Sequence, residues 1–243
     1  MISRVFDGHC HLAALNEKSV DFPRAVAAIT PTDFAALVHL RQQKPQTKIG
    51  FGLHPWAVGE YPDLVVLEQL LREQIEQYHP DFIGECGLDL LKANFEYQQT
   101  VFELQLRLAS EYQLPVVIHC VRAYNQLLML LAKAQLQVPL LVHAYNGNSE
   151  LAHQLVKKGA YLGIGSIIMN ANSQLVKSII RISQDNLLIE SDAPYMPIST
   201  KELSSSNDCE IYLQQLARLL KQDVEVLRMS INRNWSRVFA TVS

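Results

Sequence analysis

Residues 115–143 read PVVIHCVRAYNQLLMLLAKAQLQVPLLVH, which is two apolar runs around an amphipathic segment. Pro115–His119 and Pro139–His143 are continuous hydrophobic runs, typical of strands that are buried on both faces of a parallel sheet. The segment between them, Arg122–Ala134, predicts the crossover helix that two parallel strands need. This βαβ unit indicates an α/β fold, and both of its strands end in a histidine.

The same alternation runs along almost the whole chain. The predicted strands are Arg4–Asp7, Ala25–Thr30, Lys48–His54, Phe82–Gly87, Pro115–His119, Pro139–His143, Tyr161–Ile167 and Leu187–Asp192. The predicted helices are Pro31–Gln43, Asp63–Tyr78, Glu96–Tyr112, Arg122–Ala134, Ser149–Lys157, Ser173–Ser183, Asp208–Lys221 and Asp223–Phe239. This order predicts one TIM-type (β/α)8 barrel domain over residues 1–243, with an extra helix at the C-terminal end.

Two connections depart from a regular barrel. Only about a dozen residues, Leu12 to Arg24, join the first two strands, which is cramped for a full crossover with its helix. We therefore expect the first crossover helix to be short or absent. The Ser- and Thr-rich stretch Ile198–Ser206 is expected to form a loop after the last strand.

Composition excludes several classes of protein. With 49% hydrophobic residues the 243-residue chain can build a large core, and its net charge of −3 gives no bulk attraction for nucleic acid or an anionic membrane. No apolar stretch is long enough to span a bilayer, and no signal peptide is visible. The four cysteines form no CxxC pair and are expected to be reduced thiols. We expect a cytoplasmic monomer.

Histidines and carboxylates gather where the predicted strands end. In a barrel the carboxyl ends of the strands form the active-site face. The candidate metal ligands at these ends are His9, His11, Glu85, His119, His143 and Asp192. They come from the first, fourth, fifth, sixth and last strands, so the fold itself would bring them to one rim.

The types and spacing of these residues suit a pair of divalent cations. His9 and His11 are two residues apart and so point to the same side of a strand. Imidazole and carboxylate ligands suit Zn, Mn or Ni, and Mg remains possible where carboxylates dominate. Glu85 can bridge two cations with its two oxygens. Two cations lower the pKa of a bound water, and Asp192 could orient this metal-activated water and take its proton. Glu85 and Asp192 are thus the candidate catalytic residues.

Each element also has a simpler structural interpretation. An HxH pair alone is a weak signal, Glu85 could pair with a basic helix residue, and Asp192 could cap a turn. Coincidence of all six ligands in strand order is improbable. The His54-Pro55 pair is compatible equally with a structural turn and with a substrate contact, and Glu190 either orients a ligand or pairs with a base. Three cysteines next to ligands are expected to face away and pack: Cys10, Cys86 and Cys120.

Six motifs resemble the signatures of one family, and the likeness covers essentially the whole chain. They are DGHCHL (7–12), GLHPW (52–56), GECGLDLL (84–91), VVIHC (116–120), LLVHAYNG (140–147) and LIESDAPYMP (188–197). The sequence resembles the TatD family of metal-dependent hydrolases. The resemblance implies that His9, His11 and Asp192 bind one cation, that Glu85 bridges, and that His119 and His143 bind the second. The family includes deoxyribonucleases with 3′-exonuclease activity.

The chain departs from this family at positions that would contact substrate. Trp56 stands where the family has the second histidine of His-Pro-His, and Val121 stands where it has an arginine, which is displaced here to Arg122. Tyr145 replaces a phenylalanine. The resemblance implies substrate contacts at His54, Arg122 and Tyr145. Because arginine is the residue best suited to grip a phosphate, the loss of arginines weakens the case for a nuclease more than the case for metal binding.

Three functions remain open from the sequence. The first is a two-metal phosphodiesterase of the deoxyribonuclease type that acts on DNA ends. The second is a metal-dependent hydrolase of a small-molecule ester, lactone or amide. The third is a non-catalytic protein that binds metal or nucleic acid.

Overall fold

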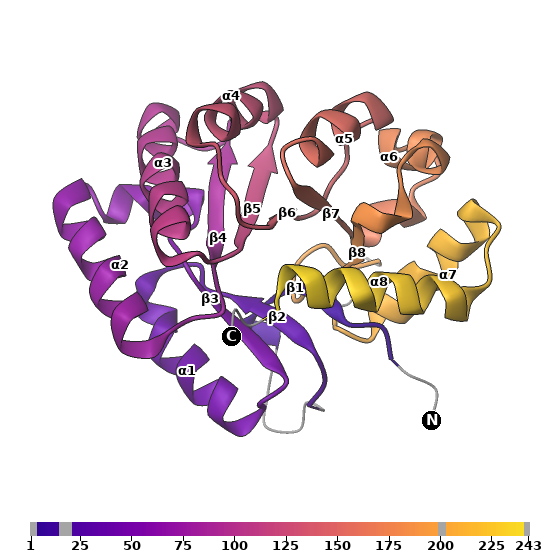
Figure 1. Cartoon of the computed structure of the whole chain (residues 1–243), viewed down its shortest axis with the longest axis horizontal. Coiled ribbons are helices and arrows are strands. Elements are labelled where there is room, and N and C mark those ends of the chain that lie inside the picture. Colours follow the sequence, from indigo (N-terminus) through magenta and orange to yellow (C-terminus); the bar gives the residue numbers. More distant parts are fainter. Residues whose placement is uncertain (1–3, 15–20, 199–202, 241–243) are drawn as a thin grey trace.

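The structure is a computed structural model that describes residues 4–14, 21–198 and 203–240. Its eight strands are β1 (Asp7–His11), β2 (Arg24–Ala27), β3 (Thr47–Phe51), β4 (Phe82–Asp89), β5 (Val116–Val121), β6 (Leu140–Val142), β7 (Ala160–Ile164) and β8 (Leu187–Ile189). They are parallel and lie side by side in chain order. Helices alternate with the strands around the outside, so the architecture is the expected TIM-type barrel (Figure 1).

The barrel closes where β1 meets the segment that follows β8. The backbone N–H of His11 donates to the carbonyl of Ala193 (2.8 Å), and the N–H of Asp192 donates to the carbonyl of His9 (2.9 Å). The seam between the first and last strands therefore runs through three of the candidate ligands, so barrel closure also sets their relative positions.

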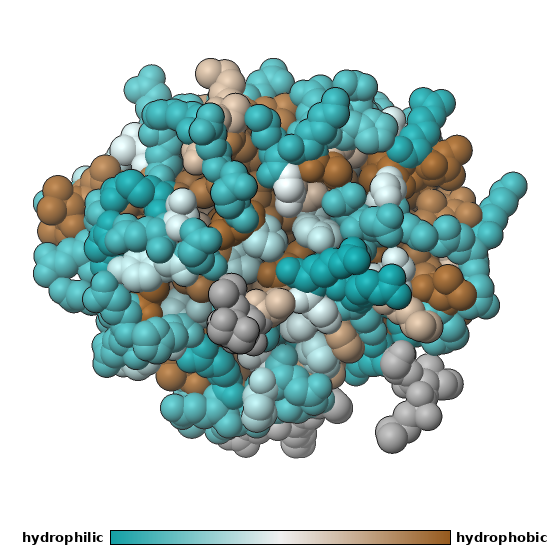
Figure 2. Space-filling view, viewed as in Figure 1, coloured by the Kyte–Doolittle hydropathy of each residue, from teal (hydrophilic) through white to brown (hydrophobic). Residues whose placement is uncertain are grey.

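Seven helices follow the strands in turn, and an eighth ends the described chain. They are α1 (Phe34–Gln43), α2 (Leu64–Tyr78), α3 (Phe95–Tyr112), α4 (Tyr124–Ala134), α5 (Ser149–Val156), α6 (Gln174–Ser178), α7 (Asp208–Leu220) and α8 (Val224–Val238). Asp63 and Asp223 cap α2 and α8 by accepting hydrogen bonds from backbone N–H groups of the first turn. Figure 2 shows mostly hydrophilic side chains over the outer helices, as helices that cover a core require.

The additional helix α8 blocks one mouth of the barrel. Trp235 and Phe239 at its C-terminal end pack with Phe82, Val117 and Leu188, which lie near the starts of their strands. The amino-terminal mouth is thus filled by apolar side chains, and the carboxyl-terminal mouth is left for the candidate ligands. This confirms the expected extra C-terminal helix.

The first strand was predicted in the wrong place. It was expected at Arg4–Asp7 and is found at Asp7–His11. The N–H of Val5 donates to Glu210 of α7, and the N–H of Phe6 donates to Asn232 of α8. These side chains take the hydrogen bonds that a strand neighbour would otherwise provide, so the ladder begins only at Asp7.

Other boundaries were predicted with mixed success. The helix expected at Ser173–Ser183 is only the five-residue α6, which passes into a 3-10 turn at Ile179–Arg181. In the described part of the first crossover the helical structure is limited to a 3-10 turn, Leu12–Ala14, and residues 15–20 lie outside the described residues. Of the loop expected at Ile198–Ser206, residues 199–202 are likewise not described. None of the described helices is both long and apolar enough to cross a membrane.

Candidate metal centre

One oxygen of Glu85 faces two candidate ligands of the first cation, His9 and His11, and Asp192 faces the same two histidines. Glu85 Oε2 lies 3.1 Å from Nε2 of His9 and 3.2 Å from Nε2 of His11. Asp192 Oδ1 lies 3.6 Å and 3.4 Å from the same two nitrogens. All four side chains are nearly inaccessible to solvent. Four ligand atoms are therefore gathered in a small buried space.

This geometry fits a cation of the size of zinc. Ligand atoms that surround one ion tetrahedrally at about 2.1 Å lie roughly 3.4 Å from one another. The four distances of 3.1–3.6 Å agree with that value. Asp192 Oδ1 is buried and accepts no hydrogen bond from the described residues, as expected for an atom whose partner is an ion.

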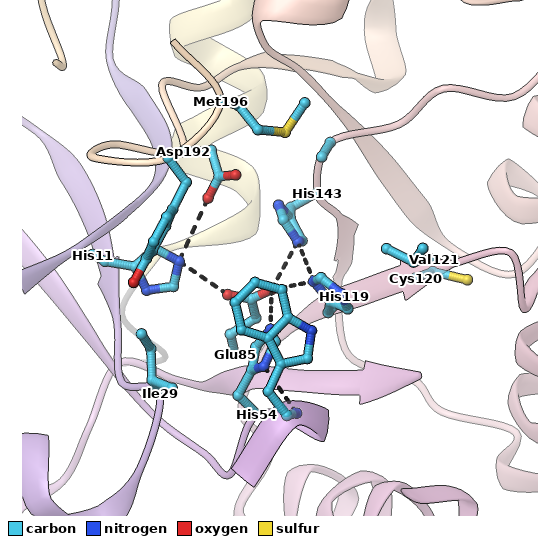
Figure 3. Close-up of a pocket in the computed structure, with 13 residues that line it drawn as sticks. His11, Ile29, His54, Glu85, His119, Cys120, Val121, His143, Asp192 and Met196 are labelled. Carbon is cyan, nitrogen blue, oxygen red and sulfur yellow. Dashed lines mark hydrogen bonds and ion pairs between the residues drawn. The ribbon is translucent and has the colours of Figure 1, made fainter. Parts of the chain in front are cut away.

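The other oxygen of Glu85 faces a second group. Glu85 Oε1 lies 2.8 Å from Nδ1 of His119 and 2.7 Å from Nε2 of His143, and these two nitrogens are 3.0 Å apart. Figure 3 shows His11 and Asp192 on one side of Glu85 and His119 and His143 on the other. The carboxylate of Glu85 is thus placed between two sets of donors, which is the arrangement that a bridging ligand needs.

His54 has the first of the two roles that the sequence left open, a structural turn, and it also contacts Glu85. Its Nδ1 accepts a hydrogen bond from the N–H of Trp56 (3.2 Å) and so caps the 3-10 helix Pro55–Glu60. Its Nε2 lies 3.2 Å from Glu85 Oε1. A neutral imidazole that accepts at Nδ1 carries its proton on Nε2, so His54 suits the role of a hydrogen-bond donor to Glu85 better than that of a ligand.

The electrostatic environment keeps both carboxylates of the cluster ionised, which favours the binding of cations. Burial alone would raise the pKa of Glu85, but the surrounding histidines, His143 first, hold it well below its usual range. Burial likewise opposes ionisation of Asp192, and the close contact with His11, followed by His143 and His9, outweighs it and lowers the pKa of Asp192. Burial would lower the pKa of His11, but its close contacts with the carboxylates of Asp192 and Glu85 raise it to about 9. His11 therefore holds a proton at neutral pH that a bound cation would displace.

Glu190 lies behind His143, on the side of its Nδ1 atom. Its side chain is fully buried, Oε1 accepts from the N–H of Ala144 (2.5 Å) and lies 3.7 Å from Nδ1 of His143. A carboxylate on the Nδ1 side favours a proton there and leaves Nε2 free to bind a cation. Burial raises the pKa of Glu190, which shows how strongly this site is removed from water. The structure favours the first of the two roles considered for this residue.

Glycine at position 163 makes room for Glu190, and replacing it by alanine tests the arrangement. A Cβ at Gly163 would lie 1.9 Å from Glu190 Oε2, whereas a Cβ at Gly165 would meet Glu190 only at 3.4 Å. We expect Gly163→Ala to destabilise the fold by about 1–3 kcal/mol and, by moving Glu190, to weaken metal binding roughly 10- to 100-fold. Thermal unfolding and metal titration measure the two effects, with Gly165→Ala as the matched control. Equal behaviour of the two variants would contradict this role.

Two further carboxylates, Asp7 and Asp89, lie next to the candidate ligands, and neither was assigned a role from the sequence. Asp7 is buried, and it accepts from the N–H groups of His9 (3.2 Å) and Ser191 (2.9 Å) and from the Ser191 hydroxyl (2.7 Å). Asp89 Oδ2 lies 3.7 Å from Nε2 of His119. Their positions near His9 and Glu85 in the same strands were the available sequence signal.

The cavity above the ligands is small and largely apolar. Its volume is about 220 Å³. It is lined by His11, Ile29, His54, Trp56, Glu85, His119, Cys120, Val121, His143, Ala144, Asp192, Tyr195 and Met196. Among the described residues, no lysine or arginine belongs to this lining. The wall therefore offers ligands and apolar surface but no fixed cation.

Two of the three residues expected to contact substrate are not part of the cavity wall. Arg122 is exposed and follows the strand in a left-handed conformation (φ 53°). Tyr145 is fully buried and its hydroxyl donates to the carbonyl of Asn148. His54 does line the cavity. Cys120 also lines it, contrary to the expectation that it faces away, and burial raises the pKa of its thiol to about 12.

Comparisons with known proteins agree with this geometry. Residues 6–240 match the family described as TatD related DNase. The uncharacterized metal-dependent hydrolase YjjV of Escherichia coli K12 is 33% identical over 150 residues, which are 55% of this chain and 57% of that protein. The 3′-5′ ssDNA/RNA exonuclease TatD of Yersinia pseudotuberculosis is 32% identical over 203 residues, which are 79% of this chain and 77% of that protein.

The fold comparison covers more of the chain than the sequence match with YjjV. The crystal structure of YjjV, a TatD homologue from Escherichia coli, superposes with a TM-score of 0.90 at 26% identity and covers 99% of this chain and 100% of that one. The family match extends over nearly the whole sequence and includes all six candidate ligands. This chain therefore belongs to the TatD related DNase family of metal-dependent hydrolases.

Proposed function

We propose that this protein is a two-metal phosphodiesterase that removes nucleotides from the end of a single-stranded nucleic acid. The observation that carries the proposal is the position of Glu85, whose two oxygens face two separate groups of ligand atoms. His9, His11 and Asp192 would complete the first cation site, and His119 and His143 the second. Zn, Mn, Mg and Ni all remain candidates for the cation.

The residues of the chain have distinct roles in this proposal. A pair of divalent cations, when bound, supplies Lewis acidity that polarises the phosphodiester and favours deprotonation of water. Asp192 lines the cavity and stays ionised at neutral pH because its pKa is lowered, so it can accept a proton from water. His54 donates to Glu85 and fixes the carboxylate, and Glu190 fixes His143.

The size of the cavity and the relatives favour a chain end as substrate. Sites for drug-sized ligands usually measure about 300–1,000 Å³, and the cavity here is smaller, at about 220 Å³. It suits the scissile group with one neighbour rather than a long segment. The name of the Yersinia relative, a 3′-5′ ssDNA/RNA exonuclease, describes the same kind of substrate. We propose further that residues 1–243 act as one domain in a cytoplasmic monomer.

The experiment combines metal content with end-labelled substrates. Protein purified without chelator should carry close to two divalent ions per chain, measured by mass spectrometry. With Mn, Zn, Mg or Ni it should release mononucleotides stepwise from single-stranded DNA or RNA. Two bound ions with no turnover on any substrate class would instead support a non-catalytic binding protein.

A second candidate function is hydrolysis of a small-molecule ester, lactone or amide. The apolar lining without lysine or arginine favours it, because that wall holds no fixed cation for a phosphate. A panel of p-nitrophenyl esters and bis-p-nitrophenyl phosphate separates the two candidates. Turnover of the carboxylic esters alone would overturn the phosphodiesterase proposal.

A further inference from the structure

Two exposed aromatic side chains stand at the mouth of the cavity. Trp56 is 49% exposed and Tyr195 is 39% exposed, although both line the cavity. Their ring centroids are 6.5 Å apart and their planes are inclined by 74°. Because both rings are partly exposed and also line the cavity, they offer apolar, aromatic surface to a ligand that enters it.

The indole of Trp56 is held in place before any ligand arrives. Its Nε1 donates to Asp89 Oδ2 (2.8 Å), and Asp89 is itself buried. The Asp89 backbone N–H donates to the buried side chain of Gln98 (2.8 Å). The imidazole of His54 packs against the indole with centroids 4.7 Å apart. A ring fixed on several sides loses little entropy on binding, so it can serve as a rigid platform.

The ammonium group of Lys92 lies over the indole of Trp56. The Nζ of Lys92 lies 4.6 Å from the centroid of the indole, and its side chain is exposed. A cation at this distance interacts with the face of the ring. Because lysine carries its charge on a flexible stem, the ammonium group can leave the ring for a nearby anion without moving the backbone. The cavity wall lacks such a charge, and Lys92 supplies it at the rim.

We propose that Trp56, Tyr195 and Lys92 form a subsite for an unpaired nucleobase and its adjoining phosphate. The base stacks on the indole in place of Lys92, the lysine ammonium pairs with the phosphate, and Tyr195 bounds the opposite side. A nucleotide offers both an aromatic face and an anion within a few ångströms, and this trio complements both. The inference deepens the proposed function and rests on it, because it names the part of the substrate that the rim recognises.

The proposed subsite would require a base at the strand end but would not select which base. Stacking accepts every base because each has a π-face, and it contributes roughly ten- to hundredfold in affinity per base. The enzyme should therefore accept all four bases at the strand end, prefer single strands, and discriminate against an end residue that lacks its base. This pattern differs from recognition through hydrogen bonds, which would select one base.

Tryptophan fluorescence tests binding without turnover. The chain has two tryptophans, and Trp235 is 6% exposed and packed at the opposite mouth of the barrel. In protein freed of metal by chelator, a thymidine dinucleotide should quench the emission of Trp56. A dinucleotide with an abasic residue should need an at least about tenfold higher concentration for half-maximal quenching. Trp56→Phe should abolish the quenching. Equal quenching by both dinucleotides, or none by either, would overturn the subsite.

Cleavage kinetics give the second readout. Trp56→Ala should raise KM for an oligonucleotide with an intact end about tenfold or more and remove the preference over an abasic end. Lys92→Met should raise KM for both substrates alike. Leu91→Ala, at an exposed neighbour outside the cavity lining, is the matched control. If no nucleic acid is cleaved with any metal, the proposed function fails, and the fluorescence titration still decides whether the subsite binds a base.

Discussion

Replacing Glu85 with glutamine is expected to reduce metal-dependent hydrolysis by on the order of 10³-fold or more, because in the proposed arrangement two cations would share this side chain. Glutamine keeps the shape of glutamate but loses the negative charge, and only one of its two terminal atoms can bind a cation. The remaining groups, two histidines with Asp192 and two histidines alone, are weaker sites. The bound metal should fall from about two ions per chain to one or fewer.

The measurement is metal content by mass spectrometry together with the initial rate on an end-labelled oligonucleotide. Glu150→Gln, at an exposed position in the first turn of α5, is the matched control and should keep both ions and full activity. Far-UV circular dichroism checks that Glu85→Gln remains folded. A variant that keeps two ions and normal turnover would show that Glu85 does not bridge.

The clustering of the candidate ligands could be predicted from the sequence because of the way a parallel barrel is built. Each strand delivers the residue at its carboxyl end to the same rim, so a histidine or carboxylate there has its location fixed by topology alone. The buried runs before His119 and His143 made those ends easy to find. The positions of these ligands depend only on the strand order, which the alternation of strands and helices predicts well.

The contacts around the ligands could not be predicted in the same way. Asp7 joins the first strand to Ser191, which is 184 positions away in the sequence. The start of β1 depends on side chains of α7 and α8, which are 205 and 226 positions away from their partners. Such pairings follow from the closed barrel and leave no periodic pattern. Local periodicity therefore places β1 too early and misses the part played by Asp7.

At the rim of the barrel the two-residue period of the strands ends. This period predicts the face to which each side chain points only while the backbone stays extended. Arg122, Ala144 and Asp192 all have positive φ angles, between 46° and 53°. Each of them follows a strand or lies at the end of one, so the two-residue period ends there. For this reason the side chain of Arg122 does not reach the cavity even though it is next to a strand that ends at the site.

The candidate ligands and the rest of the cavity wall differ in residue type, and this difference bears on how a substrate would be held. The buried histidines and carboxylates form groups that could hold a metal ion. The wall offers aromatic and apolar groups in place of arginines, and Lys92 stands at its edge. A member of this family with such a wall would hold its substrate by stacking on the base more than by gripping each phosphate, so affinity should depend less on salt than in an arginine-rich nuclease.

Replacing Asp192 with asparagine (Asp192→Asn) is expected to lower turnover by about 10²–10⁴-fold, the usual contribution of a general base. The amide oxygen can still face His9 and His11, so the bound metal should fall less than in Glu85→Gln. Asp192 has a lowered pKa and is therefore ionised throughout the range above its ordinary value near 3.8. Its protonation cannot produce an acid limb between pH 5 and 9, so the substitution should lower the rate at every pH in that range without shifting the profile.

The pH profile distinguishes a proton acceptor from a simple ligand. If Asp192 serves only as a ligand, added metal should restore the rate of Asp192→Asn, and the profile should shift with metal concentration because cations compete with the proton on His11. If it accepts a proton, saturating metal restores occupancy and leaves the rate low. Asp185→Asn should match the unmodified protein, because Asp185 is exposed and precedes the start of β8, whereas Asp192 follows the end of that strand. Rates and metal content measured together across pH 5–9 therefore assign the role of this one carboxylate, because occupancy and turnover respond differently in the two cases.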